Sequence, residues 1–240
     1  MTATLMWAVL PSAGAGAITG GTEDVPFSHA ATVSLQLRGR HLCGATLIAP
    51  TTVLTSASCA AGASGLTIRA HVHDLRRPDA ESTGKTIAVK SVHRHPDFDA
   101  ATGHNDIAVL LLGEPVPNVQ PAALPAAGTG TPKGTALLLA GWGATQQDGP
   151  GSPVLNTASV LVDDAAPCAA ATGQSVPAEM LCTPSEGGKD ACTGDTGGPA
   201  FAGAVVQAIQ TLTGCGRPGH PTELTAVSAY RDFIDRWTGQ

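Results

Sequence analysis

The spacing of apolar residues constrains this fold most strongly. Short runs rich in Val, Ile, Leu and Thr recur along the chain, and each is bounded by Gly, Pro, Asp or Ser. With 29 Gly and 18 Pro among 240 residues, many strands joined by turns are favoured over long helices. The runs lie at 32–37, 42–48, 52–55, 66–72, 87–92, 107–112, 135–140, 158–162, 180–183, 204–209 and 224–227. The pattern predicts an all-β protein.

Two segments depart from this pattern. Residues 114–134 are rich in Pro, Gly and Ala without periodicity, so we expect them to connect two halves of similar architecture. Near the end, Tyr230, Phe233, Ile234 and Trp237 recur at helical spacing between charged residues. This spacing predicts an amphipathic C-terminal helix whose aromatic side chains pack against the second half.

Charge and hydropathy exclude several classes of binding partner. The net charge is −6 and basic residues form no cluster, which argues against nucleic acid, heparin-like polyanions and acidic membranes. No apolar run approaches the roughly 18 residues of a membrane span. Residues 1–17 carry no charge and end in Ala15-Gly16-Ala17, which fits a cleaved signal or pro segment. Because a basic start is missing, a truncated N-terminus is the alternative.

Six cysteines, an even number, indicate an oxidising compartment and up to three disulfides. Their spacing cannot choose among the 15 pairings that six cysteines permit. We expect a secreted, extracellular and monomeric protein with no cofactor and no metal ion.

Five motifs occur in a fixed order along the chain. They are Ile18-Thr19-Gly20-Gly21, Thr55-Ser56-Ala57-Ser58-Cys59, His104-Asn105-Asp106-Ile107-Ala108, Gly141-Trp142-Gly143 and Lys189-Asp190-Ala191-Cys192-Thr193-Gly194-Asp195-Thr196-Gly197-Gly198-Pro199. Together they resemble the trypsin and chymotrypsin family of serine proteases, from Ile18 to near the end of the chain.

The resemblance implies two six-stranded antiparallel β-barrels packed around a cleft, with a C-terminal α-helix. It places the first barrel at about 18–118, the second at about 119–227 and the helix at about 228–238. It also implies three disulfides, namely Cys43 with Cys59, Cys168 with Cys182 and Cys192 with Cys215.

The catalytic triad of the family is degenerate here. The family uses a serine nucleophile, a histidine base and a buried aspartate that orients the histidine. Only the carboxylate remains, as Asp106; the histidine position is Ser58 and the nucleophile position is Thr196. A Ser hydroxyl cannot act as a base near neutral pH, and the β-branch of Thr restricts its first torsion. We therefore predict that the chain does not cleave peptides.

The substrate pocket is also altered. Asp190 matches the aspartate that gives trypsin its preference for Arg and Lys, but two glycines of the pocket wall are Leu212 and Thr222. Side chains at these positions are expected to fill the pocket, and Asp190 to be satisfied by local hydrogen bonds.

Other family features are retained. The backbone of Gly194 and Thr196 can form an oxyanion hole. Asp195 can pair with the α-amine of Ile18 if processing exposes it.

No other histidine is expected to replace the missing base. His41 resembles a position near the floor of the active site, and His104 lies two residues before Asp106. The spacing of His71 with His73, and of His93 with His95, suits a metal pair on a strand. Because no cysteine or carboxylate completes a ligand set, we interpret these four as ordinary strand or loop residues.

The leading hypothesis is a secreted, catalytically inactive homologue that acts by binding another secreted protein. By analogy with glucanase-inhibitor proteins of oomycetes, we expect an inhibitor or decoy of a secreted hydrolase such as a glucanase. The alternative is an active trypsin-like serine-type endopeptidase with a displaced base or a Thr nucleophile. A plain carrier domain is a third interpretation without a sequence feature in its favour.

Overall fold

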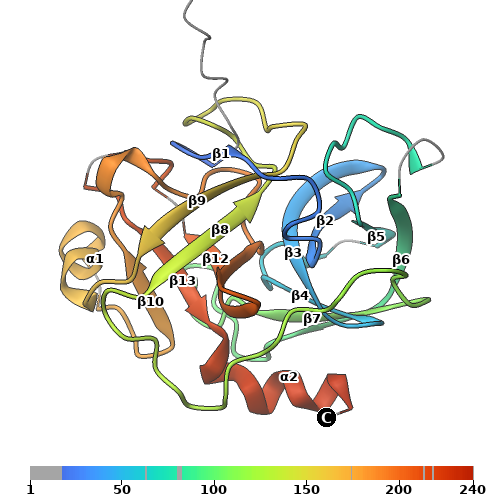
Figure 1. Ribbon diagram of the computed structural model, residues 1–240. Helices are drawn as coiled ribbons and strands as arrows, with labels where there is room; N and C mark the ends of the chain where they lie inside the picture. Colours follow the sequence, from blue (N-terminus) through green and yellow to red (C-terminus); the bar gives the residue numbers. More distant parts are fainter. Residues whose placement is uncertain are drawn as a thin grey trace, which may run out of the picture.

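The computed structural model describes residues 18–62, 64–79, 83–173, 175–212, 214–217 and 219–239, without the side chains of Glu186 and Leu212. The predicted leader at 1–17 lies outside this part of the chain. Two β-structures lie side by side, and helix α2 (Arg231–Thr238) runs beneath them (Figure 1). The all-β prediction is confirmed.

The first β-structure is a closed barrel of six strands in the order β2-β3-β4-β7-β6-β5, and all pairs are antiparallel. Its core is aliphatic and includes Val33, Leu35, Leu47, Ile68 and Leu110, each fully buried. The strands are β2 (Thr32–Leu37), β3 (Arg40–Ala49), β4 (Thr52–Thr55), β5 (Leu66–Ala70), β6 (Lys85–Arg94) and β7 (Ala108–Leu112). All six correspond to runs predicted from the sequence.

The second β-structure is a sheet of seven strands in the order β1-β9-β8-β11-β12-β13-β10, rather than a ring of six. The seventh strand is β1, which lies near the start of the described chain and pairs with β9. The bounds are β1 (Thr22–Glu23), β8 (Ala136–Gly141), β9 (Asn156–Leu161), β10 (Met180–Thr183), β11 (Pro199–Ala202), β12 (Val205–Leu212) and β13 (Thr222–Ala226). An isolated bridge between Asp163 and Cys182 joins the ends of β9 and β10, so the sheet curls towards closure.

Two strands and one helix were not predicted. Strand β1 has two residues, and β11 (Pro-Ala-Phe-Ala) has no β-branched residue, so neither forms a recognisable run. Helix α1 (Ala165–Thr172) is Ala-rich, and Cys168 is its buried residue. It has no apolar stripe, so the periodicity that revealed α2 is absent.

Helix α2 follows a 3₁₀ turn at Val227–Tyr230 and buries Phe233 and Ile234, so the predicted amphipathic helix is present. Its aromatic side chains do not pack on the second half alone. Trp237 stacks on His93 of β6, and Phe233 contacts His95, so the helix also packs against the first barrel.

All three implied disulfides are present: Cys43–Cys59, Cys168–Cys182 and Cys192–Cys215. The first joins β3 to the turn after β4. The second fastens α1 to β10. The third ties the loop before β11 to the segment after β12. Each closes a loop that the unfolded chain would otherwise leave free, which stabilises the fold by limiting the unfolded state.

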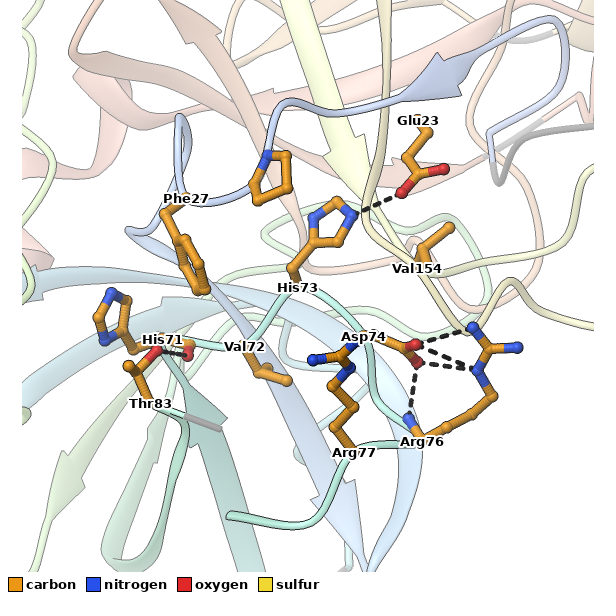
Figure 2. A pocket seen from close by; sticks show the side chains of 11 residues that line it. Glu23, Phe27, His71, Val72, His73, Asp74, Arg76, Arg77, Thr83 and Val154 are labelled. Carbon is orange, nitrogen blue, oxygen red and sulfur yellow. Dashed lines mark hydrogen bonds and ion pairs between the residues drawn. The ribbon is translucent and has the colours of Figure 1, made fainter. Parts of the chain in front are cut away.

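Both predicted histidine pairs have ordinary structural partners. His71 packs on Phe27 with ring centroids 4.8 Å apart, and Nε2 of His73 lies 2.9 Å from Oε1 of Glu23 (Figure 2). His93 stacks on Trp237, and His95 contacts Tyr230 and Phe233 beneath α2. Within the described ranges, no group of three His, Cys, Asp or Glu side chains is arranged to hold a metal ion.

Of the helices in the described ranges, none combines the length and the apolar character needed to cross a membrane.

The two β-structures approach most closely at Gly44 of β3. A Cβ at this position would lie 2.5 Å from Cα of Gly198 and 2.7 Å from its nitrogen. The amide of Gly44 donates to the carbonyl oxygen of Thr196 at 2.9 Å. Because both neighbours are backbone, neither can move away as a side chain would. Glycine at position 44 therefore sets how closely the 195–198 loop packs on the first barrel.

Gly44→Ala should destabilise the protein by about 1–3 kcal/mol because the added methyl overpacks a backbone contact. Gly130→Ala is the matched control, since nothing lies within 4 Å of a Cβ there and its φ is not positive. Thermal unfolding of both variants and the parent measures the difference. Equal melting temperatures for the two variants would contradict this account of the interface.

Candidate active site

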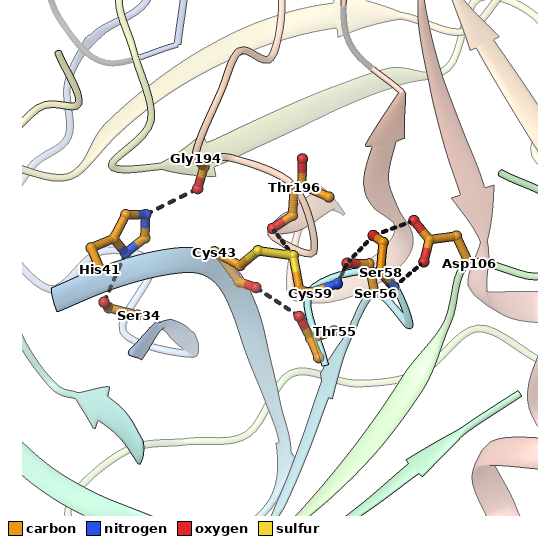
Figure 3. Close-up of a disulfide and its surroundings, with 11 residues drawn as sticks. Ser34, His41, Cys43, Thr55, Ser56, Ser58, Cys59, Asp106, Gly194 and Thr196 are labelled. Carbon is orange, nitrogen blue, oxygen red and sulfur yellow. Dashed lines mark hydrogen bonds between the residues drawn. A yellow bond between two sulfur atoms is a disulfide. The ribbon is translucent and has the colours of Figure 1, made fainter. Parts of the chain in front are cut away.

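The candidate site lies where the ends of two paired strands meet the loop before β11. Strands β4 and β7 are antiparallel, with Thr55 opposite Ala108, so the residues after β4 and before β7 share one edge. This register brings Ser58 and Asp106 together although 48 residues separate them. The Gly44 contact brings in Thr196, whose carbonyl oxygen lies 3.5 Å from Sγ of Cys59. Figure 3 shows all three residues around the Cys43–Cys59 disulfide.

Ser58 satisfies both oxygens of the Asp106 carboxylate. Its amide donates to Oδ1 at 2.7 Å, and its hydroxyl donates to Oδ2 at 2.8 Å (Figure 3). The hydroxyl of Ser56 lies 3.1 Å from that of Ser58, which extends the polar chain inward. Burial raises the pKa of Asp106, and the bonds from Ser58 oppose that shift. Both carboxylate oxygens of Asp106 are thus held by Ser58, and the assignment of the two residues to triad positions remains a prediction.

The loop that carries Thr196 is held from both sides. The amides of Asp195, Gly197 and Gly198 donate to the carbonyl oxygens of Cys192, Gln210 and Asp195. The amides of Gly194 and Thr196 donate to no acceptor in the described part of the chain. Two such neighbouring donors are what an oxyanion hole requires. That these two amides form an oxyanion hole remains a prediction.

His41 braces this loop. Its Nε2 lies 2.9 Å from the carbonyl oxygen of Gly194, and its Nδ1 lies 2.8 Å from Oγ of Ser34. Because a carbonyl only accepts, Nε2 carries the proton in this contact. Burial lowers the pKa of His41, which favours the neutral ring. Both ring nitrogens are engaged, so His41 does not bridge Asp106 and Thr196.

His104 does not bridge them either, since none of the side-chain hydrogen bonds to Asp106 in the described residues comes from an imidazole.

The family model for trypsin matches residues 18–234. The chain belongs to the trypsin family. It is 34% identical over 232 residues to human serine protease 56, covering 91% of this chain and 38% of that protein. Trypsin of the beetle Phaedon cochleariae is 34% identical, with 92% of this chain and 88% of that protein covered. The vitellin-degrading protease of Bombyx mori is 36% identical, with 91% and 84% covered. The chain thus spans well under half of serine protease 56 but most of the two insect proteases.

One oxygen of the Asp190 carboxylate is held by local donors. Oδ2 accepts from the hydroxyl of Ser185 at 3.0 Å and from the amide of Gly216 at 2.8 Å. Oδ1 is buried without a hydrogen-bond partner in the described residues. Burial raises the pKa of Asp190 to about 6. The expected local hydrogen bonds are therefore present for Oδ2, and the role of Asp190 in a substrate pocket remains a prediction.

The predicted wall residues are described only in part. Thr222 is 1% exposed and lies in β13 opposite Thr183 of β10. The side chain of Leu212 lies outside the described part of the chain. A filled pocket therefore remains a prediction, supported by the burial of Thr222.

Asp195 is wholly buried and has no ion pair with a cation in the described residues. Its Oδ1 accepts from the amide of Gly143 at 2.8 Å, and its Oδ2 accepts from the amide of Cys192 at 3.0 Å. Burial raises its pKa to about 7. Ile18 is wholly buried and belongs to the core of the second sheet. Its pairing with Asp195 through a new α-amine remains a prediction.

Several supporting residues were missed by sequence reasoning. Ser34 orients His41, and Ser185 holds Asp190. The hydroxyl of Tyr230 donates to Oδ1 of Asn105 at 3.0 Å, which ties the C-terminal helix to the loop of Asp106. Isolated serines give no signal in a single sequence, and the motif around Asn105 does not reveal its partner, since only the fold selects which side chains meet.

The uncut chain should become more stable as the pH falls from about 8 to 4. Because the folded pKa of Asp195 is about 7 against roughly 4 when unfolded, the folded state binds a proton across this range that the unfolded state lacks. The gain in unfolding free energy is on the order of 3–4 kcal/mol. Asp190 acts in the same direction. Urea unfolding at several pH values measures this slope.

The Asp195→Asn variant, which does not titrate, should lose most of this slope, whatever its absolute stability. A form that begins at Ile18 should lose it too, because its α-amine would pair with the ionised carboxylate. An unchanged slope in Asp195→Asn would show that another group is responsible.

Proposed function

We propose that this trypsin-family chain is a secreted, non-catalytic homologue that acts by binding another protein. The observation that carries the proposal is the double hydrogen bond of Ser58 to Asp106. In a working triad the aspartate holds an imidazole, which takes the proton of the nucleophile. A Ser hydroxyl in that place cannot take a proton near neutral pH. Thr196 therefore has no base.

The geometry around Thr196 supports the same proposal. Its side-chain hydroxyl has no hydrogen-bond partner among the described residues. In other serine proteases, loss of the nucleophile or the base lowers turnover by on the order of a million-fold. The oxyanion donors and substrate binding alone leave roughly a thousand-fold acceleration over water. The activity that remains would be too low for a useful protease.

The alternative is an active serine-type endopeptidase. The names of the relatives favour it, because the similar proteins include two called trypsin and one called a vitellin-degrading protease. Such an activity would need a base from outside the described contacts, for example from the substrate. The two proposals differ in one measurable property, the reactivity of Thr196.

The disulfides and the net charge of the chain are consistent with a secreted protein partner. Three disulfides suit an oxidising compartment, and the net charge of −6 disfavours polyanionic partners. That the partner is a secreted hydrolase, inhibited or sequestered by this chain, rests on analogy alone. A pull-down from extracellular fluid, followed by assay of any captured hydrolase with and without the chain, tests it.

The purified chain should not react with a fluorophosphonate probe, because Thr196 is not activated. A trypsin is the positive control, and Thr196→Ala is the matched negative control. The measurement is the fraction of protein labelled, read by intact mass. Stoichiometric labelling of the parent that disappears in Thr196→Ala would refute the non-catalytic proposal.

Restoring the triad with Ser58→His and Thr196→Ser should leave cleavage of Arg substrates at least roughly 100-fold below that of a trypsin, because the pocket remains filled. Adding Leu212→Gly and Thr222→Gly to this variant should then raise the activity. Initial rates on an Arg amide substrate measure both steps. Trypsin-like rates in the double variant would refute the filled pocket.

A further inference from the structure

A cavity of about 590 Å³ lies away from the degenerate triad, between β1 and the turn after β5. Figure 2 shows Phe27 and His71 at one end and Asp74 with Arg76 at the other. Pro26, Val72 and Val154 also line it, so its wall is largely apolar. Its volume lies within the range of roughly 300–1,000 Å³ that is typical of ligand sites.

One cationic side chain at this cavity makes no hydrogen bond or ion pair in the described part of the chain. Arg76 forms a bidentate pair with Asp74, with its Nε 2.9 Å from Oδ1 and its terminal nitrogen 2.7 Å from Oδ2. Glu23 contacts His73. Arg77 lines the same cavity, and its guanidinium has no hydrogen bond or ion pair among the residues that the structure describes. Its charge nevertheless lowers the pKa of Asp74, so it lies within electrostatic reach of that carboxylate.

An exposed apolar side chain lines the cavity, that of Phe27, which is 45% exposed. Two residues earlier in the chain, Val25 is 70% exposed. Both lie on the segment that follows β1, the edge strand of the seven-stranded sheet. Clustered exposed apolar side chains beside an unpaired edge are typical of surfaces that bind extended peptides. The Arg77 guanidinium lines the same cavity as Phe27 and has no hydrogen-bonded partner in the described ranges, so it can bind a carboxylate through two parallel hydrogen bonds.

We propose that this cavity binds an extended segment of a partner protein in which an acidic side chain stands between apolar ones. The carboxylate pairs with Arg77, and the apolar side chains pack on Phe27, Val72 and Val154. The inference deepens the proposed function, because it assigns protein binding to a surface outside the degenerate active site. It does not depend on the reactivity of Thr196, so either proposal can fail without the other.

The test is fluorescence anisotropy with a labelled, end-capped peptide Gly-Leu-Glu-Leu-Gly and the full chain. Saturable binding should weaken about tenfold or more when Glu in the peptide becomes Gln, or when the chain carries Arg77→Gln. Phe27→Ala should weaken binding as well. Phe27 already has a φ of 68°, so Ala adds no backbone strain there.

Arg94→Gln is the matched control, since Arg94 is an exposed arginine outside this cavity, and it should leave binding unchanged. Absence of saturable binding to the parent at millimolar peptide would overturn the proposal. Equal binding of the Glu and Gln peptides, or of the parent and Arg77→Gln, would do the same. Benzoate binding as tight as the peptide would assign the cavity to small aromatic acids and overturn the peptide proposal.

Discussion

The backbone contact between Gly44 and the 195–198 loop is the constraint on which the site depends. It joins the closed barrel to the seven-stranded sheet without an intervening side chain. Through it the carbonyl oxygen of Thr196 accepts a hydrogen bond from β3, and the same oxygen contacts Sγ of Cys59 in the Cys43–Cys59 disulfide. The register of β4 with β7 independently delivers Ser58 to Asp106. The fold therefore brings Ser58, Asp106 and Thr196 to one place, and the proposed loss of catalysis rests on the side chains at these positions.

Buried carboxylates give this framework its electrostatic character. Asp106, Asp190 and Asp195 are each nearly inaccessible, and burial raises the pKa of all three. Each is held by backbone amides or hydroxyls rather than by a described cation. Neutral donors orient a carboxylate without fully offsetting the cost of removing its charge from water. The hydrogen bonds thus fix the positions of these carboxylates, while burial disfavours their charged forms.

The proposed loss of catalysis and the proposed peptide binding can be tested separately, because they involve different parts of the fold. The degenerate triad lies where β4, β7 and the loop before β11 converge. The cavity with Arg77 lies between β1 and the turn after β5, lined by side chains that no catalytic role requires. The proposed binding cavity can therefore be tested whether or not Thr196 reacts, since its lining shares no residue with the candidate active site.

The sequence by itself determined the family and, through the family resemblance, the three cysteine pairs, because contiguous motifs carry that information. The same motifs assigned Ser58 and Thr196 to catalytic positions as a prediction. The sequence also predicted nearly all strands, since short runs rich in Val, Ile, Leu and Thr bounded by turn residues are typical of strands. Strand β1 is too short to form such a run, β11 has no β-branched residue, and helix α1 is too uniform to show a period.

Only the tertiary structure decided which side chains complete the site. Ser34 bonds to His41, Ser185 to Asp190 and Asn105 to Tyr230, and the two members of each pair come from separate segments of the chain. The cavity lined by Arg77 likewise joins the segment around β1 and the turn after β5 to Val154 of the second half. Such contacts depend on strand register and on the approach at Gly44, and neither is encoded by neighbouring residues alone.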